Sequence, residues 1–213
     1  MGRGSSKVGV GAPKGSSGGS IENVIETLND KYDVKVDISE AGNYQKEAEE
    51  NVKHFAKLMD EYDSTAVSYG IAPSSLGQEA GQAYMLNGKT AILVQAKALK
   101  NRAATDELGL GDNQYLGLTY HEFAHSLSQS REKVDNGFWK EIRALKREYQ
   151  NQINTSDWSK KKISSYASKD FDEFFAEGFT QAKLAKNPSN YSKKILEITD
   201  KYFKKIGGNH GKR

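Results

Sequence analysis

Hydrophobic residues in the first part of the chain alternate between helical and strand-like spacing. Apolar positions three and four residues apart predict a helix over 21–32, with Ser20 as its cap, and a second helix over 43–62. Alternation of apolar and polar residues predicts short strands at 34–38 and 65–73. This part of the chain therefore combines helices with a small sheet.

A β-hairpin at 83–94 is the clearest local signal in the sequence. Asn87 and Gly88 lie between two apolar runs, and both residue types tolerate the positive φ angles of a type I′ turn. A hairpin strand at the edge of the sheet could pair with an extended peptide. The pattern is equally compatible with an internal strand.

From about residue 114 the spacing becomes helical. It predicts helices at 114–130, 138–153 and 169–186, and a fourth that is opened by Asn187-Pro188-Ser189 and continues through 191–206, with Pro188 suited to its first turn. The predicted fold class is therefore α+β. An N-terminal helix and a small mixed sheet with a β-hairpin precede a central helix, and an all-helical C-terminal subdomain follows.

The predicted elements fall into a single domain, 21–213. We expect an α/β lobe at about 21–110, a helical lobe at about 111–213, and a cleft between them. Residues 1–20 are rich in Gly and Ser, which predicts a flexible tail or linker. Such a segment would suit a junction to a longer precursor or to a virion protein.

The composition is that of a soluble globular protein, with 36% hydrophobic and 28% charged residues. The chain has no cysteine, which excludes disulfides and thiolate metal ligands. No apolar run approaches the length of a transmembrane helix, and no signal peptide is visible. We expect a soluble protein without stable membrane insertion, either secreted or delivered as an effector, or associated with a virion.

The net charge of +3 is small, and the C-terminal lysines interleave with an apolar stripe. This pattern favours a solvated helix face over a nucleic-acid-binding patch. We therefore expect no nucleic-acid partner, and a nucleic-acid-binding domain is the least favoured of the functional classes.

The segment His121-Glu122-Phe123-Ala124-His125 lies within predicted helix 114–130. Residues four apart share a helix face, so the two imidazoles approach one point, with Glu122 on the same side. Zinc suits such a pair of histidines, and Glu122 would act as the general base for a water bound to the metal. Two of the four histidines fall in this motif, which favours a site over a chance match. His54 has no partner at ligand spacing and is expected at the surface or at a boundary.

A catalytic zinc site needs a third protein ligand and one position open to water. The extended motif with a further Gly and His is excluded, because Ser128 and Arg131 occupy those positions. All methionines precede the motif, so the methionine turn of that class is also absent. The remaining candidates are carboxylates on a later helix.

Predicted helix 169–186 supplies these acids, namely Asp170, Asp172, Glu173 and Glu177. Glu173 and Glu177 share a face in an aromatic-rich segment, where burying a carboxylate is costly unless a metal or a donor compensates. One would bind the metal, and the other would orient a histidine through its Nδ1–H. The spacing does not choose between them, and it also allows both to be solvated.

The stretch SSYASKDFDEFFAEGF (164–179), placed after HEFAH, resembles the catalytic domain of anthrax lethal factor and the related Pro-Pro endopeptidases, which are gluzincin-type zinc metallopeptidases. The resemblance covers roughly residues 115–206. It implies a zincin-like fold, with Glu173 as the third zinc ligand, Tyr166 as a phenol over the open position and Glu177 as a supporting residue. Tyr166 could instead be a core aromatic.

The resemblance implies a zinc-dependent metalloendopeptidase that acts on a protein or peptide substrate. The segments are also similar to toxin-type domains attached to phage head-morphogenesis proteins, which implies a toxin, effector or phage-associated setting. The alternative is a virion or surface structural module that zinc stabilises, without proteolytic activity. Glu122 argues against that alternative, because a purely structural zinc site has no use for a general base.

Overall fold

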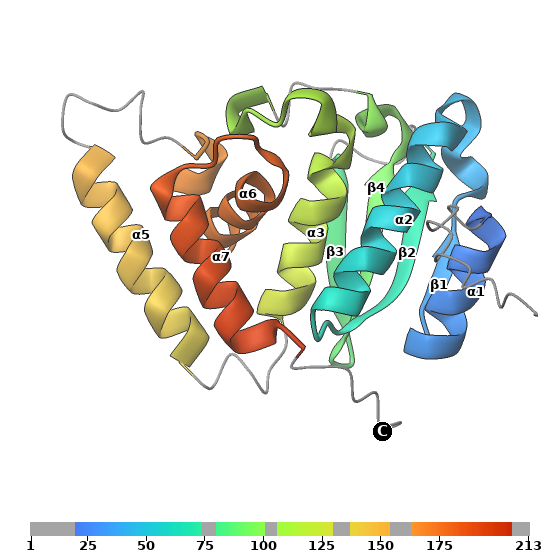
Figure 1. Cartoon of the computed structure of the whole chain (residues 1–213), viewed down its shortest axis with the longest axis horizontal. Coiled ribbons are helices and arrows are strands. Elements are labelled where there is room, and N and C mark those ends of the chain that lie inside the picture. The colour runs from blue at the N-terminus through green and yellow to red at the C-terminus, as the bar shows by residue number, and fades with distance from the viewer. Residues whose placement is uncertain (1–19, 74–79, 101–105, 130–136, 154–162, 206–213) are drawn as a thin grey trace, which may run out of the picture.

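The computed structural model describes residues 20–73, 80–100, 106–129, 137–153 and 163–205 (Figure 1). The predicted tail before Ser20 and the residues from 206 on lie outside the described residues. The α-helices of the described part are α1 (Ile21–Tyr32), α2 (Gln45–Glu61), α3 (Gly117–Ser128), α5 (Trp139–Ile153), α6 (Phe171–Leu184) and α7 (Asn190–Phe203). Its strands are β1 (Lys35–Asp37), β2 (Ala66–Ala72), β3 (Gly81–Leu86) and β4 (Lys89–Gln95).

The strands form one mixed sheet in the order β1-β2-β4-β3. Strands β1, β2 and β4 are parallel, and β3 pairs antiparallel with β4. The predicted hairpin is confirmed, since Asn87 and Gly88 both have positive φ, at 53° and 78°, between β3 and β4. Its first strand, β3, lies at the edge of the described sheet.

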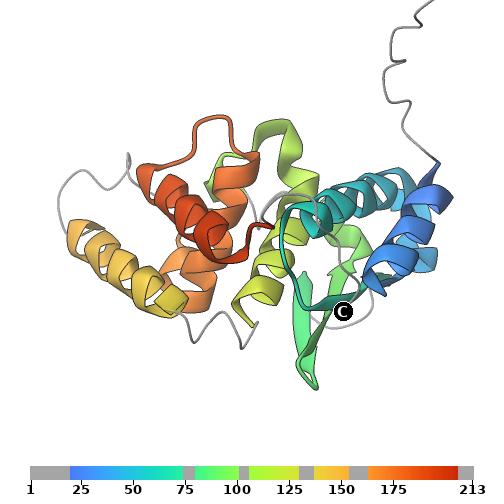
Figure 2. The same ribbon diagram turned by 60° about the horizontal axis from the view of Figure 1, so that its bottom comes forward.

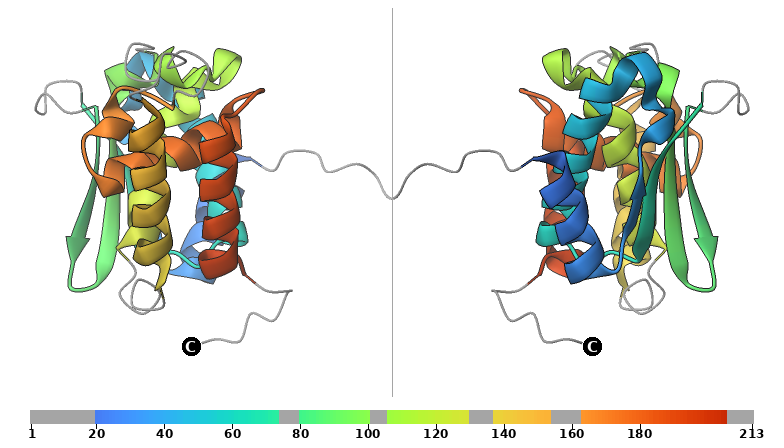
Figure 3. Two further views of the ribbon diagram at one scale, coloured as in Figure 1. Left: turned by 90° about the vertical axis from the view of Figure 1, so that its left-hand side faces the viewer. Right: turned by 90° about the vertical axis from the view of Figure 1, so that its right-hand side faces the viewer.

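The sheet forms one layer, and α1, α2 and α3 lie on one side of it (Figure 3). The α5, α6 and α7 helices form a group on the other side of α3 from the sheet (Figure 2). Helix α3 is therefore the central element, packed against the sheet, α2 and α6. A residue on α3 can reach both the start of β3 and the first turn of α6.

An aromatic cluster beneath α3 fixes how this helix is rotated. Phe123 is fully buried, with its ring centroid 6.0 Å from that of Phe55 on α2 and 6.5 Å from that of Phe179 on α6. Phe55 in turn stacks on Tyr69 of β2 at 4.9 Å. Because Phe123 points into this core, residues 121, 122 and 125 are turned toward a different side of the helix.

The structure refines several predicted boundaries. Residues 111–116 form a 3-10 helix before α3, and its first residue, Gly111, has positive φ, so the α-helix begins at Gly117 instead of residue 114. The prediction that Pro188 lies in the first turn of the last helix is wrong. Ser189 is the N-cap, because its side chain accepts the backbone N–H of Ser192, so the helix begins at Asn190 and Pro188 precedes it.

The α+β class is confirmed, with the N-terminal helix, the small mixed sheet and its hairpin, the motif helix and the helical C-terminal part in the predicted order. Within the described ranges, no helix combines the length and the apolar character that a membrane span requires.

Candidate metal centre

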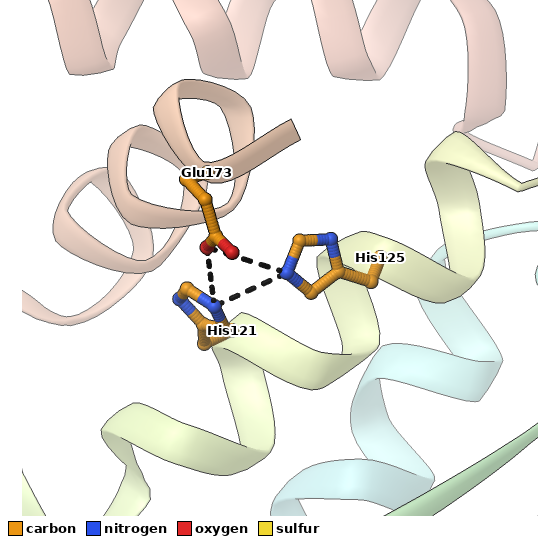
Figure 4. Close-up of side chains that lie close together, drawn as sticks. All are labelled: His121, His125 and Glu173. Carbon is orange, nitrogen blue, oxygen red and sulfur yellow. Dashed lines mark hydrogen bonds and ion pairs between the residues drawn. The ribbon is translucent and has the colours of Figure 1, made fainter. Parts of the chain in front are cut away.

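Two histidines on α3 present their Nε2 atoms to each other. His121 and His125 lie one helical turn apart, and their Nε2 atoms are 3.1 Å apart (Figure 4). The two rings are nearly perpendicular, at 77°. The predicted i, i+4 geometry of the motif therefore brings both imidazoles to one point.

Glu173 reaches the same point from the first turn of α6. The carboxylate of Asp170 caps this helix by accepting the backbone N–H of Glu173 at 2.9 Å. Glu173 Oε2 lies 3.1 Å from His121 Nε2 and 3.6 Å from His125 Nε2 (Figure 4). Three groups from two helices thus converge.

These three groups fit a metal ion. Glu173 Oε2 is buried, and within the described residues it lies close to the two histidine Nε2 atoms without a well-formed hydrogen bond, which is costly for a carboxylate oxygen. Zinc bonds of about 2.0–2.1 Å in tetrahedral geometry set neighbouring ligand atoms about 3.3 Å apart. The observed separations of 3.1, 3.1 and 3.6 Å lie close to that value. Two imidazoles and a carboxylate are ligands that zinc prefers, so the cluster is compatible with zinc.

The charges of the cluster are strongly coupled. Burial alone would lower the pKa of His121, but its close contacts with the carboxylates of Glu173 and Glu177, together with the charge of Glu122, raise that pKa to about 10. Burial would likewise raise the pKa of Glu173, but His121 and His125 hold it well below its usual range. A metal ion that binds here must therefore displace a proton from His121.

Glu177 supports the cluster from one turn further along α6. Its Oε1 atom lies 2.9 Å from His121 Nδ1, and its Oε2 atom accepts the hydroxyl of Ser164. A carboxylate only accepts hydrogen bonds, so Nδ1 is the donor and Nε2 is the nitrogen that faces the cluster. The choice between the two glutamates, which their spacing left open, depends on how α6 is rotated toward α3.

Glu122 lines a pocket that opens beside the metal cluster. The pocket has a volume of about 780 Å³, and its walls come from the start of β3, from α3 and from residues 164–173. Glu122 is only 5% exposed, and its carboxylate packs against the backbone of Gly81 in β3. The pocket is large enough for part of a peptide chain.

Tyr166 lies at the rim of this pocket, in a 3-10 turn before α6. Its side chain is 47% exposed, and its ring centroid is 6.2 Å from that of His121. The ammonium of Lys169 donates to the Tyr166 hydroxyl at 3.1 Å and lies 3.4 Å from Glu173 Oε1. Partial burial raises the pKa of the Tyr166 phenol, and the Lys169 hydrogen bond opposes this rise.

Other sequence candidates lie outside the cluster. Asp170 caps α6, and Asp172 lies 3.4 Å from the hydroxyl of Ser128. His54 is a half-buried boundary residue, as expected, with its Nδ1 atom 2.9 Å from the Tyr120 hydroxyl. None of these three belongs to the cluster of His121, His125 and Glu173.

Sequence reasoning missed three residues around the site, Gly81, Ser164 and Lys169. Gly81 and Ser164 are each about 40 residues from the motif, so no local spacing connects them with it. Lys169 is four residues before Glu173, and an i, i+4 ion pair across the start of α6 could have indicated its contact.

Few known proteins are detectably similar to this chain. No protein-family model matches the chain, and no curated protein is detectably similar to it. Among solved structures, a candidate zinc-binding metallo-peptidase from Bacteroides caccae is similar, with a TM-score of 0.41 and 13% identity over 88% of this chain and 87% of that chain. Both values are low, so this similarity carries no conclusion about function.

Proposed function

We propose that this protein is a zinc-dependent metalloendopeptidase. The observation that carries the proposal is the buried Oε2 atom of Glu173, which lies 3.1 and 3.6 Å from the Nε2 atoms of His121 and His125, with Glu122 in the adjoining pocket. In the described part of the chain the cluster has three protein ligands, the number typical of catalytic zinc sites. Structural zinc sites usually have four.

The proposed roles follow from the positions of the side chains. His121, His125 and Glu173 would hold the ion, which when bound supplies Lewis acidity and lowers the pKa of a water ligand toward ~7. Glu122 would accept the proton of the attacking water and pass it to the leaving amine. The Tyr166 hydroxyl, at the rim of the same pocket, would donate a hydrogen bond to the developing oxyanion.

The β3 strand supports an extended peptide as the substrate. It lies at the edge of the described sheet, and residues 80–84 form one wall of the pocket beside Glu122. A peptide aligned with such a strand would pass the pocket in extended form. This arrangement favours cleavage within a chain over removal of a terminal residue.

The resemblance to the lethal factor catalytic domain and the Pro-Pro endopeptidases extends the proposal. It assigns to Glu173, Tyr166 and Glu177 the same roles that their positions favour here. A toxin, effector or phage-associated setting belongs to the same proposal, and it rests only on the sequence resemblance.

Metal analysis coupled to digestion of a peptide library tests the proposal. We expect one zinc per chain, cleavage that is read by mass spectrometry, and loss of cleavage on chelation with recovery on adding zinc. One zinc per chain without cleavage would support the zinc-stabilised structural module instead. A purified protein that binds no zinc would contradict both.

A further inference from the structure

The buried hydroxyl of Ser164 connects the metal cluster with the turn that carries Tyr166. Ser164 is 3% exposed and lies just before the turn that carries Tyr166. Its Oγ atom donates to Glu177 Oε2 at 2.5 Å and accepts the backbone N–H of Ala167 at 3.0 Å. A serine hydroxyl has one proton and two lone pairs, so both bonds can form together.

The first of these bonds leads to the metal cluster. Glu177 uses Oε2 for Ser164 and Oε1 for His121 Nδ1, so its carboxylate is held at both oxygens. This holds the carboxylate in the position that keeps the proton on Nδ1 and leaves Nε2 for a metal. Without the serine hydroxyl, Oε2 would be a buried oxygen without this donor, and the carboxylate could rotate away from His121.

The second bond leads to the phenol. Ala167 follows Tyr166 directly, and the Ala167 N–H bond to Ser164 fixes the backbone of this turn. The Tyr166 side chain is half exposed and contacts Lys169 and the ring of His121, and the backbone of the turn sets the point from which it extends. The oxygen atom that holds Glu177 therefore also helps to hold the turn that carries the phenol, together with the backbone bonds from Ser168 to Ser165 and from Lys169 to Tyr166.

We propose that Ser164 is a positioning residue. Through its bond to Glu177 it orients the His121 imidazole, and through its bond to Ala167 it positions the Tyr166 hydroxyl relative to that imidazole. The effect on zinc affinity is independent of the reaction. The effect on the phenol deepens the proposed peptidase function and rests on it.

The test compares Ser164→Ala with Ser168→Ala in the full chain. Ser168 lies in the same turn, but its side chain is exposed and is not part of the pocket, so it controls for changes in the turn itself. Zinc affinity is measured by chelator competition. We expect about a tenfold loss for Ser164→Ala, the low end of the range for residues that support a ligand, and no change for Ser168→Ala. Equal affinities in the two variants would overturn the proposal.

The second readout is kcat at saturating zinc, in a cycle that combines Ser164→Ala with Tyr166→Phe. If the serine acts by positioning the phenol, Ser164→Ala lowers kcat severalfold in the parent and much less when the phenol hydroxyl is already absent. If Ser164→Ala lowers kcat by the same factor with and without the Tyr166 hydroxyl, the proposed effect of Ser164 on the phenol is wrong.

If Ser164→Ala does not fold, Ser164→Cys keeps a side chain of similar size with a weaker donor and should change zinc affinity and kcat in the same direction. If zinc binds but no peptide is cleaved, the proposed function fails, and zinc affinity still decides the role of Ser164.

Discussion

Glu122 and Gly81 approach so closely that a side chain at the start of β3 would displace the Glu122 carboxylate. A Cβ atom at position 81 would lie 2.7 Å from Glu122 Oε1 and 3.0 Å from its Cγ, well inside van der Waals contact. The absence of a side chain at Gly81 thus allows the proposed general base to lie against the strand that forms the wall of the pocket. The contact places the proposed base directly beside the strand with which a peptide substrate is proposed to align.

Gly81→Ala should therefore impair catalysis without removing zinc. The added methyl must push the Glu122 carboxylate aside, and a displacement of about 1 Å at a reacting group can lower the rate about 100-fold. We expect kcat to fall by about one to two orders of magnitude, with zinc affinity unchanged. Gly70→Ala in β2 is the matched control, because its Cβ would meet Leu93 Cδ1 at 3.1 Å, away from the site. Equal kcat values for Gly81→Ala and Gly70→Ala would contradict the proposal that the Gly81 contact positions Glu122 for catalysis.

The two glutamates of α6 should differ in their effect on metal affinity. Glu173→Gln removes the charged oxygen that faces both histidine Nε2 atoms and should weaken zinc binding the most. Glu177→Gln should weaken it by about 10- to 100-fold, because this residue orients His121 without facing the metal position. Each variant is the other's control, since both are buried and one turn apart. Chelator competition that gives the reverse order would assign the ligand to Glu177.

Zinc affinity should keep rising with pH well above neutrality. Because the pKa of His121 is raised from 6.5 to about 10 in the metal-free protein, zinc must displace a proton throughout that interval. The association constant should rise about tenfold per pH unit between pH 7 and 8.5, and calorimetry in two buffers should detect about one released proton. A constant affinity above pH 7 would contradict the raised pKa. In the metal-free protein, the stabilisation from this shift is complete below pH 6.5 and is lost as the pH rises through about 10.

Tyr166→Phe should lower kcat and leave zinc binding intact. The phenol contacts Lys169 and faces the pocket, but it is not one of the three metal-ligating groups. Loss of one oxyanion donor typically lowers kcat by about 100- to 1,000-fold. Steady-state kinetics at saturating zinc would show a reduced kcat with little change in KM. A variant as active as the parent would identify Tyr166 as a structural aromatic.

The sequence predicts the elements whose signals are local. The hairpin depends on Asn87 and Gly88, which accept positive φ wherever they occur, and the structure has both. The α3 histidines meet because residues four apart always share a helix face. Boundaries were less predictable, since residues 114–116 at the predicted start of the motif helix belong to a 3-10 helix, and the α-helix begins only at Gly117.

Relationships between distant elements could not be predicted from spacing. Glu173 and Glu177 occupy the same face of α6, and which of them faces Nε2 depends on how α6 is rotated and packed against α3. That packing is set by contacts such as Phe123 with Phe179, which join residues 56 positions apart. The contact of Gly81 with Glu122 and the two bonds of Ser164 likewise require the assembled fold.

The most direct test of the central proposal is a comparison of the parent protein with Glu122→Gln on the same peptide library, with zinc measured in both. The change keeps the size of the side chain and removes its ability to accept a proton at neutral pH. We predict one zinc per chain in each protein, cleavage by the parent, and no detectable cleavage by Glu122→Gln. A Glu122→Gln variant that cleaves as fast as the parent would contradict the proposal.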